Sequence, residues 1–172
     1  MAATVPCIGC RAEVPEISGA VHRYMESSPG CWAIYGEVLA REYTNVAFAA
    51  AHRLTVDSYA VQHPGQPSPQ SIQSVGLHLI SLSLVLDHGA TMQQATEALQ
   101  RGSLYKNIFV WLEPPDDLGR ITVVDVHAAD SPEAHIECVW DWARASRAAW
   151  AQQSDRIENW IRQMSLLPGR AT

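Results

Sequence analysis

The stretch SPQSIQSVGLHLISLSLVLDHG, residues 68–89, decides the fold, because it predicts a long helix that must lie inside the molecule. Ser68 can cap this helix with Pro69 in the first position, and Gly89 supplies a C-terminal stop. The side chains in between are apolar on most faces, so other helices have to surround them. The stretch therefore predicts a helical protein built around this central segment.

Helical patterns flank the central segment on both sides. The predicted helices share apolar residues at helical spacing and span residues 32–43, 46–62, 92–102 and 132–164. Thr122 and Asp125 form a capping box that predicts a further short helix, whereas residues 108–112 could be extended. The expected fold class is all-α, a helical bundle of about five or six helices with short connections.

Composition limits the classes of function that suit this chain. With 172 residues and a formal net charge of −6, it fits one domain, or a domain with a small appendage, and has no basic footprint for nucleic acid. The sequence does not begin with a basic region and an apolar run, and the apolar stretch 75–86 is interrupted by His78 and two serines. We expect a cytoplasmic protein with no membrane span, in which the cysteines stay reduced.

The domain organisation follows the distribution of proline and glycine. Residues 1–31 contain repeated proline and glycine and show no sustained helical periodicity. They predict an element built of loops, which needs a bound metal ion or a covalent link to be stable. Residues 32–167 form the expected bundle, and residues 168–172 are expected to be a frayed tail.

The amino-terminal element carries a set of residues with the chemistry of zinc ligands: Cys7, Cys10, His22 and Cys31. Two residues between the first two cysteines let one tight turn aim both sulfurs at one ion, and three thiolates with one imidazole complete a tetrahedron. Redox use of the first pair, or no special role for the cysteines, are the alternatives. If His22 points away, three cysteines would leave a fourth position for water or substrate, and the zinc would be catalytic.

A second group of polar residues falls on two consecutive helices and supplies candidates for catalysis: His52, Asp57, Tyr59, Gln62, His63 and His78. His52, Tyr59 and His63 return to within about 20° of one angular position and form a stripe on one helix face. Asp57 lies about 140° from His52, so it could orient an imidazole or serve a neighbouring helix. The alternative is that these groups are satisfied core residues that order the proline loop.

The motifs C-x-x-C, H-x-Y-M-x-x-S-P-G-C-W, H-R-L-T-V-D-x-Y-A-x-Q-H-P and F-V-W-L-E-P-P resemble those of an uncharacterised bacterial family of small proteins, a domain of unknown function. The resemblance covers about residues 7–150, and the run from His52 to Pro64 is its most specific part. It implies that the candidate metal and catalytic residues coincide with motif positions of that family, but it identifies no substrate.

Two functions remain open on the sequence. The first is a small metal-dependent enzyme for hydrolysis or elimination on a small polar molecule, with His52 and His63 as acid–base groups and Tyr59 or Gln62 positioning the substrate. The second is a zinc-stabilised, non-catalytic binding or regulatory module for a protein or small ligand. Both are compatible with a homodimer.

Overall fold

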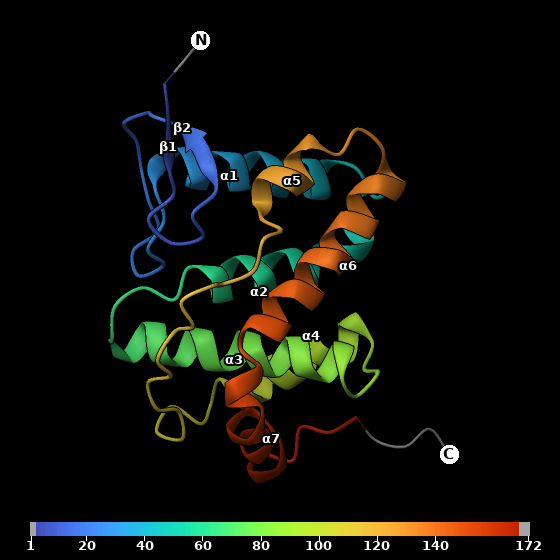
Figure 1. Cartoon of the computed structure of the whole chain (residues 1–172). Helices are drawn as coiled ribbons and strands as arrows, with labels where there is room; N and C mark the ends of the chain where they lie inside the picture. Colours follow the sequence, from blue (N-terminus) through green and yellow to red (C-terminus); the bar gives the residue numbers. More distant parts are fainter. Residues whose placement is uncertain (1–2, 169–172) are drawn as a thin grey trace.

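The computed structural model describes residues 3–168 and confirms the all-α fold class (Figure 1). Seven α-helices lie in this part of the chain: α1 (Pro29–Thr44), α2 (His52–Gln62), α3 (Pro69–Leu86), α4 (Met92–Gly102), α5 (Val123–Ala128), α6 (Pro132–Ala149) and α7 (Ser154–Gln163). The predicted tail, residues 168–172, lies outside the described residues apart from Pro168. None of the helices within residues 3–168 is both long and apolar enough to cross a lipid bilayer.

Helix α3 occupies the central position that its sequence predicts. The Ser68 side chain accepts from the backbone N–H of Ser71, and the Ser71 hydroxyl oxygen accepts from the backbone N–H of Ser68. Pro69 is the first residue of the helix. At the other end, Gly89 adopts a φ of +67°, which a residue with a side chain rarely adopts. Helices α2, α4, α6 and α7 all contact α3, so its apolar surface is covered.

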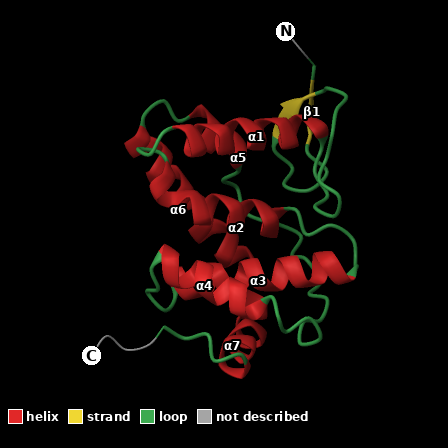
Figure 2. Ribbon diagram, turned by 180° about the vertical axis from the view of Figure 1, so that it is seen from behind, coloured by secondary structure: helices red, strands yellow, loops and turns green. Residues whose placement is uncertain are grey.

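The helices lie in successive tiers, as the two opposite views show (Figures 1 and 2). Helices α1 and α5 form the outer tier beside the amino terminus, α2 lies below them, and α3 and α4 follow. Helix α6 runs across the tiers and contacts α2, α3 and α5, and α7 lies at the far end against α3. This arrangement brings the end of α2 to the amino-terminal element.

The amino-terminal element contains a β-hairpin that the loop prediction did not include. Strands β1 (Thr4–Pro6) and β2 (Glu13–Pro15) pair antiparallel, with Val5 opposite Val14. The two strands are three residues long, too short for a periodic pattern to register in the sequence. Their connection carries the C-x-x-C motif, and β2 packs against α1.

Two predicted helix boundaries are wrong. The second helix begins at His52 rather than at residue 46, because residues 49–51 form a 3₁₀ turn. The long final helix breaks at Trp150, whose buried indole donates to the Val61 carbonyl, and a 3₁₀ turn at Ala151–Gln153 redirects the chain into α7. Both helices place apolar residues at helical spacing, so periodicity alone does not reveal the break between them.

Candidate metal centre

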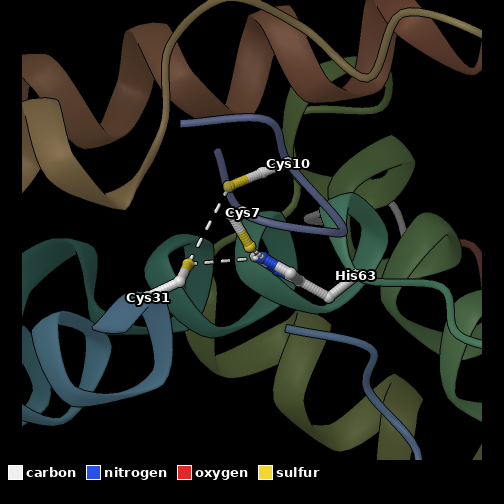
Figure 3. Close-up of side chains that lie close together, drawn as sticks. All are labelled: Cys7, Cys10, Cys31 and His63. Carbon is white, nitrogen blue, oxygen red and sulfur yellow. Dashed lines mark hydrogen bonds between the residues drawn. The ribbon is translucent and has the colours of Figure 1, made fainter. Parts of the chain in front are cut away.

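Four side chains with metal-binding atoms meet where the hairpin, α1 and α2 come together (Figure 3). Cys7 and Cys10 come from the hairpin connection, Cys31 from the first turn of α1, and His63 from the residue that follows α2. Their ligand atoms all lie within 4.8 Å of one another, and none of the four residues is more than 5% exposed. They form a closed Cys₃His cluster.

Three of the six distances between the ligand atoms match the edges of a zinc tetrahedron. Cys31 Sγ lies 3.8 Å from Cys10 Sγ and 3.5 Å from His63 Nε2, and Cys7 Sγ lies 3.6 Å from the same nitrogen. With Zn–S bonds of about 2.3 Å and Zn–N bonds of about 2.0 Å, a regular tetrahedron places two sulfurs about 3.8 Å apart and sulfur and nitrogen about 3.5 Å apart. The donor set and its spacing therefore fit zinc.

The C-x-x-C connection is folded by local hydrogen bonds. The Cys7 N–H donates to the Ala12 carbonyl at 2.8 Å, and the Arg11 N–H donates to the Cys7 carbonyl at 3.1 Å. A Cβ atom at Gly9 would lie 2.4 Å from the Glu26 carbonyl oxygen and 2.5 Å from the His63 ring, so only glycine fits there. The connection can thus pack directly on the fourth ligand.

The His63 ring is oriented for coordination. Its Nδ1 lies 2.7 Å from the Tyr59 carbonyl oxygen one turn earlier in α2, so Nδ1 carries the proton and donates it to that carbonyl. Nε2 faces the sulfurs and is the nitrogen from which a metal ion would displace the second proton. Burial lowers the pKa of His63, but hydrogen bonds and negative charge from Cys10 and Cys7 outweigh burial and raise it to about 9.

The three thiols affect one another's ionisation. Hydrogen bonds from Cys10 and Cys31 hold the pKa of Cys7 well below its ordinary value. Hydrogen bonds with Cys10 and Cys7 raise the pKa of Cys31, and its burial adds to the effect. Three buried thiolates at this spacing repel one another, so the fully ionised set requires a cation at its centre.

Two donors outside the cluster support two of the three sulfurs. The Ser28 N–H lies 3.4 Å from Cys7 Sγ, and the Tyr59 hydroxyl lies 3.7 Å from Cys31 Sγ. The Tyr59 ring is stacked between Tyr35 and His63, with ring centroids 3.8 and 4.0 Å away. Burial, followed by the charge of Cys31, raises the pKa of Tyr59, so its hydroxyl keeps the proton that it donates.

His22, the fourth ligand suggested by the sequence, lies outside the cluster. Its Nδ1 accepts from the backbone N–H groups of Tyr24 and Met25 at 3.4 and 3.2 Å, and its ring lies against Trp32. Burial lowers the pKa of His22. His63, which the sequence suggested for acid–base catalysis, completes the cluster instead. The only local feature that singles out His63 in the sequence is its position at the end of the most specific motif.

We therefore expect His63→Ala to abolish stoichiometric metal binding and His22→Ala to retain about one metal ion per chain. The reason is that Nε2 of His63 faces the three sulfurs, whereas Nδ1 of His22 is occupied by the backbone. Elemental analysis of both variants after native purification checks this. Loss of metal from His22→Ala with retention in His63→Ala would reverse the assignment.

The predicted stripe on α2 exists, but its members contact different partners along α1. Helices α1 and α2 run antiparallel at this interface: His52 meets Glu42 near the end of α1, and Tyr59 meets Tyr35 and Cys31 nearer its start. The stripe is therefore a helix–helix contact that ends at the metal centre, and its residues do not line one shared cavity.

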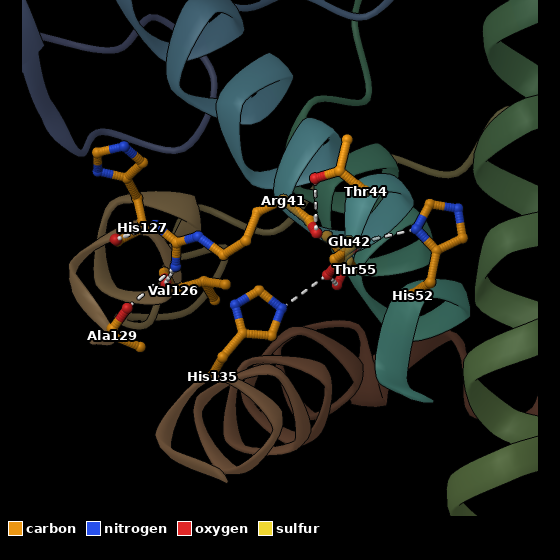
Figure 4. A network of polar contacts seen from close by, with 9 residues as sticks. All are labelled: Arg41, Glu42, Thr44, His52, Thr55, Val126, His127, Ala129 and His135. Carbon is orange, nitrogen blue, oxygen red and sulfur yellow. Dashed lines mark hydrogen bonds and ion pairs between the residues drawn. The ribbon is translucent and has the colours of Figure 1, made fainter. Parts of the chain in front are cut away.

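Glu42 is the centre of a buried network that joins three helices (Figure 4). Its carboxylate lies 2.7 Å from His52 Nδ1, 2.6 Å from the Thr55 hydroxyl and 2.9 Å from His135 Nε2. Burial alone would raise the pKa of Glu42, but the hydrogen bonds from His135, His52 and Thr55 outweigh it and lower the pKa. One residue earlier, Arg41 donates to the last carbonyls of α5.

Asp57 serves the neighbouring helix, as its angular position allowed, and does not orient His52. Its fully buried carboxylate accepts from Arg53 on its own helix and from His78 and Ser81 on α3, at 2.7, 2.7 and 2.5 Å. Asp57 thus fastens α2 to α3. The His78 ring is held by this carboxylate through Nδ1.

Gln62 is engaged in structural hydrogen bonds on every polar atom of its side chain. Its amide nitrogen donates to the carbonyls of Leu118 and Ile121, and its oxygen accepts from the Trp142 indole at 2.8 Å. The side chain therefore ties α2 to α6 and to the loop before α5. The six candidate catalytic residues therefore lie in four separate groups of contacts: with Glu42, with α3, with the cluster and with α6.

A pocket lies next to the loops that carry the cluster. It has a volume of about 360 Å³ and is lined by Ile8 and by the segments 21–27 and 65–68. His22 lies in its wall, whereas the six candidate catalytic residues do not. Ile8 follows Cys7 and residues 65–68 lie just after His63, so two parts of the lining are close in the chain to residues of the cluster.

The comparisons with known proteins give a family without an assigned activity. A family described as a family of unknown function (DUF5946) has a model that matches residues 5–151, which include all four residues of the cluster. Searches of the curated proteins and of the solved structures found no match for the chain.

Proposed function

Because the chain belongs to a family of unknown function, DUF5946, we propose its function from the metal centre itself: it is a zinc-stabilised binding module. The zinc ion is proposed to hold the amino-terminal hairpin to α1 and to the end of α2. The observation that carries this proposal is the closure of the cluster, since four protein ligands are all but fully buried. Structural zinc sites have four protein ligands, whereas catalytic ones keep an open position.

The pocket beside the metal centre is the proposed ligand site. One wall, residues 21–27, includes Glu26, which packs on Gly9 of the hairpin connection, and the other, residues 65–68, lies just after His63, which also packs on Gly9. Withdrawal of the ion would release the connection and deform the pocket. The metal would therefore act on ligand binding through the shape of the loops, without touching the ligand.

A metal-dependent hydrolase or lyase receives less support from the geometry. A closed tetrahedron leaves no position for water or substrate, and the predicted acid–base residues are engaged with buried carboxylates, sulfurs or backbone groups. The proposal includes a cytoplasmic location, because zinc-bound thiolates persist where thiols stay reduced.

Cobalt substitution tests whether the site is closed. We expect one metal ion per chain, and a Co²⁺ form with thiolate-to-cobalt charge-transfer absorption and the visible bands of tetrahedral cobalt. Because all four positions are taken by the chain, excess imidazole should leave these bands unchanged. A shift of the visible bands on addition of imidazole would show an open position and favour the catalytic alternative.

A further inference from the structure

The three sulfurs of the metal centre have unequal surroundings. Cys7 Sγ accepts from the Ser28 backbone and Cys31 Sγ accepts from the Tyr59 hydroxyl. Within residues 3–168, Cys10 Sγ has no hydrogen-bond donor from outside the cluster. A hydrogen bond withdraws electron density from a thiolate and lowers its nucleophilicity, so Cys10 is the most nucleophilic of the three.

Cys10 is also the least buried of the three cysteines of the cluster. Cys7 and Cys31 are fully buried, whereas Cys10 is 5% exposed and lines a second pocket of about 360 Å³. The hairpin connection, residues 9–12, forms one wall of this pocket and residues 116–120 form the other. The lining carries two arginines and two aspartates, so its charges balance and an uncharged reagent can enter it.

A second thiolate lies next to Cys10 and can complete an oxidation. Cys31 Sγ is 3.8 Å from Cys10 Sγ. A disulfide needs the sulfurs at about 2.05 Å, so the hairpin connection has to move toward α1 by a small distance only. Cys10 belongs to a connection outside regular secondary structure, which makes such a movement feasible.

On these observations, and on the zinc centre proposed above, we infer that Cys10 is a modification site at which a peroxide oxidises the metal centre. The Cys10 thiolate attacks one oxygen of hydrogen peroxide, the O–O bond breaks, and Cys10 becomes a sulfenic acid. The hydroxide that leaves takes up one proton from solvent and becomes water. The Cys31 thiolate then attacks the Cys10 sulfenic acid, and a second hydroxide leaves and is protonated. The two thiolates lose two electrons in total, and the peroxide is reduced to two waters.

The product retains only two of the four ligands. Cys7 and His63 remain, and the Cys10–Cys31 disulfide no longer offers thiolates. The ion is then released, and the hairpin connection loses its attachment to the end of α2. The oxidation would thus disconnect the amino-terminal element reversibly, since a thiol reductant restores both ligands.

The test uses the native, zinc-loaded chain whose metal content has been measured beforehand. At substoichiometric hydrogen peroxide, a dione probe that traps sulfenic acids should label Cys10 about tenfold more than Cys7 or Cys31. At higher peroxide, one zinc ion per chain should appear in a chromogenic chelator assay, in step with a Cys10–Cys31 disulfide found by peptide mass mapping. Cys138→Ser is the matched control and should leave both readouts unchanged.

Cys138 suits this control because it lies in α6, outside the cluster, and burial raises its pKa to about 11. If zinc is bound but Cys7 or Cys31 is labelled as readily as Cys10, or if zinc leaves without the Cys10–Cys31 disulfide, the inference is wrong while the zinc centre stands. If the purified chain binds no zinc, the proposed function is wrong and the inference falls with it.

Discussion

Removal of the metal ion is expected to lower the melting temperature of the chain by about 8–16 °C. At free zinc about 1,000-fold above the dissociation constant, binding contributes about 4 kcal/mol to the stability of the folded state. In a chain of this size, 1 kcal/mol shifts the melting temperature by about 2–4 °C. The amino-terminal element depends most on the ion, because it has only a short hairpin to hold it otherwise.

Calorimetry of the zinc-loaded and chelator-treated protein measures this effect, together with the pair Cys31→Ser and Cys138→Ser. Cys31→Ser should behave like the metal-free protein, because it removes a buried ligand. Cys138→Ser should melt within a few degrees of the parent chain, because Cys138 is only partly buried and lies outside the cluster. An unchanged melting temperature in protein shown to be free of metal would contradict the structural role.

Glu42→Ala is expected to lower the free energy of unfolding by about 3–5 kcal/mol. The carboxylate is the shared acceptor for His52, Thr55 and His135, and its loss leaves those donors without a partner in the interior. The matched control is Glu37→Gln on the same helix. Glu37 also lies 2.7 Å from a histidine, His127, but its side chain is 67% exposed, so the change should cost less than about 1 kcal/mol.

Because of the Glu42 carboxylate, we expect the stability of the folded chain to depend on pH. The pKa of Glu42 in the folded chain lies below its ordinary value of 4.5, so the ionised group stabilises the folded state fully above that pH. This contribution is lost as the pH falls below 4.5 and through the lower folded pKa. Denaturant unfolding of the parent chain and Glu42→Gln at a series of pH values measures it. A stability difference that stays constant below pH 4.5 would contradict the assignment.

The polar residues of α2 acquire a physical explanation from these contacts. His52 and Thr55 bind Glu42 on α1, Asp57 binds α3, and Tyr59 and His63 reach the metal centre. A single helix therefore supplies attachments to three parts of the molecule. Of its polar residues, these five contact other elements or belong to the Cys₃His cluster.

The amino-acid sequence by itself determined the features that depend on neighbouring residues. The capped, apolar segment after Ser68 predicted the central helix α3, and the spacing of Cys7 and Cys10 predicted two ligands on one turn. The helix prediction is confirmed and the two cysteines lie in one cluster, because caps, helical periodicity and a tight turn act within a few residues of one another. The sequence also singled out Cys31, which lies in the cluster, because of its residue type and its place beside the loop-rich element.

Only the tertiary structure decided which histidine completes the cluster. His22 is closer to Cys31 in the sequence, but His63 is brought to the sulfurs because α2 packs antiparallel on α1 and ends beside Cys31. The same packing separated His52 from His63, although both lie on one stripe. A ligand set is fixed by distances of a few ångströms between segments, and those distances follow from helix packing that no local pattern encodes.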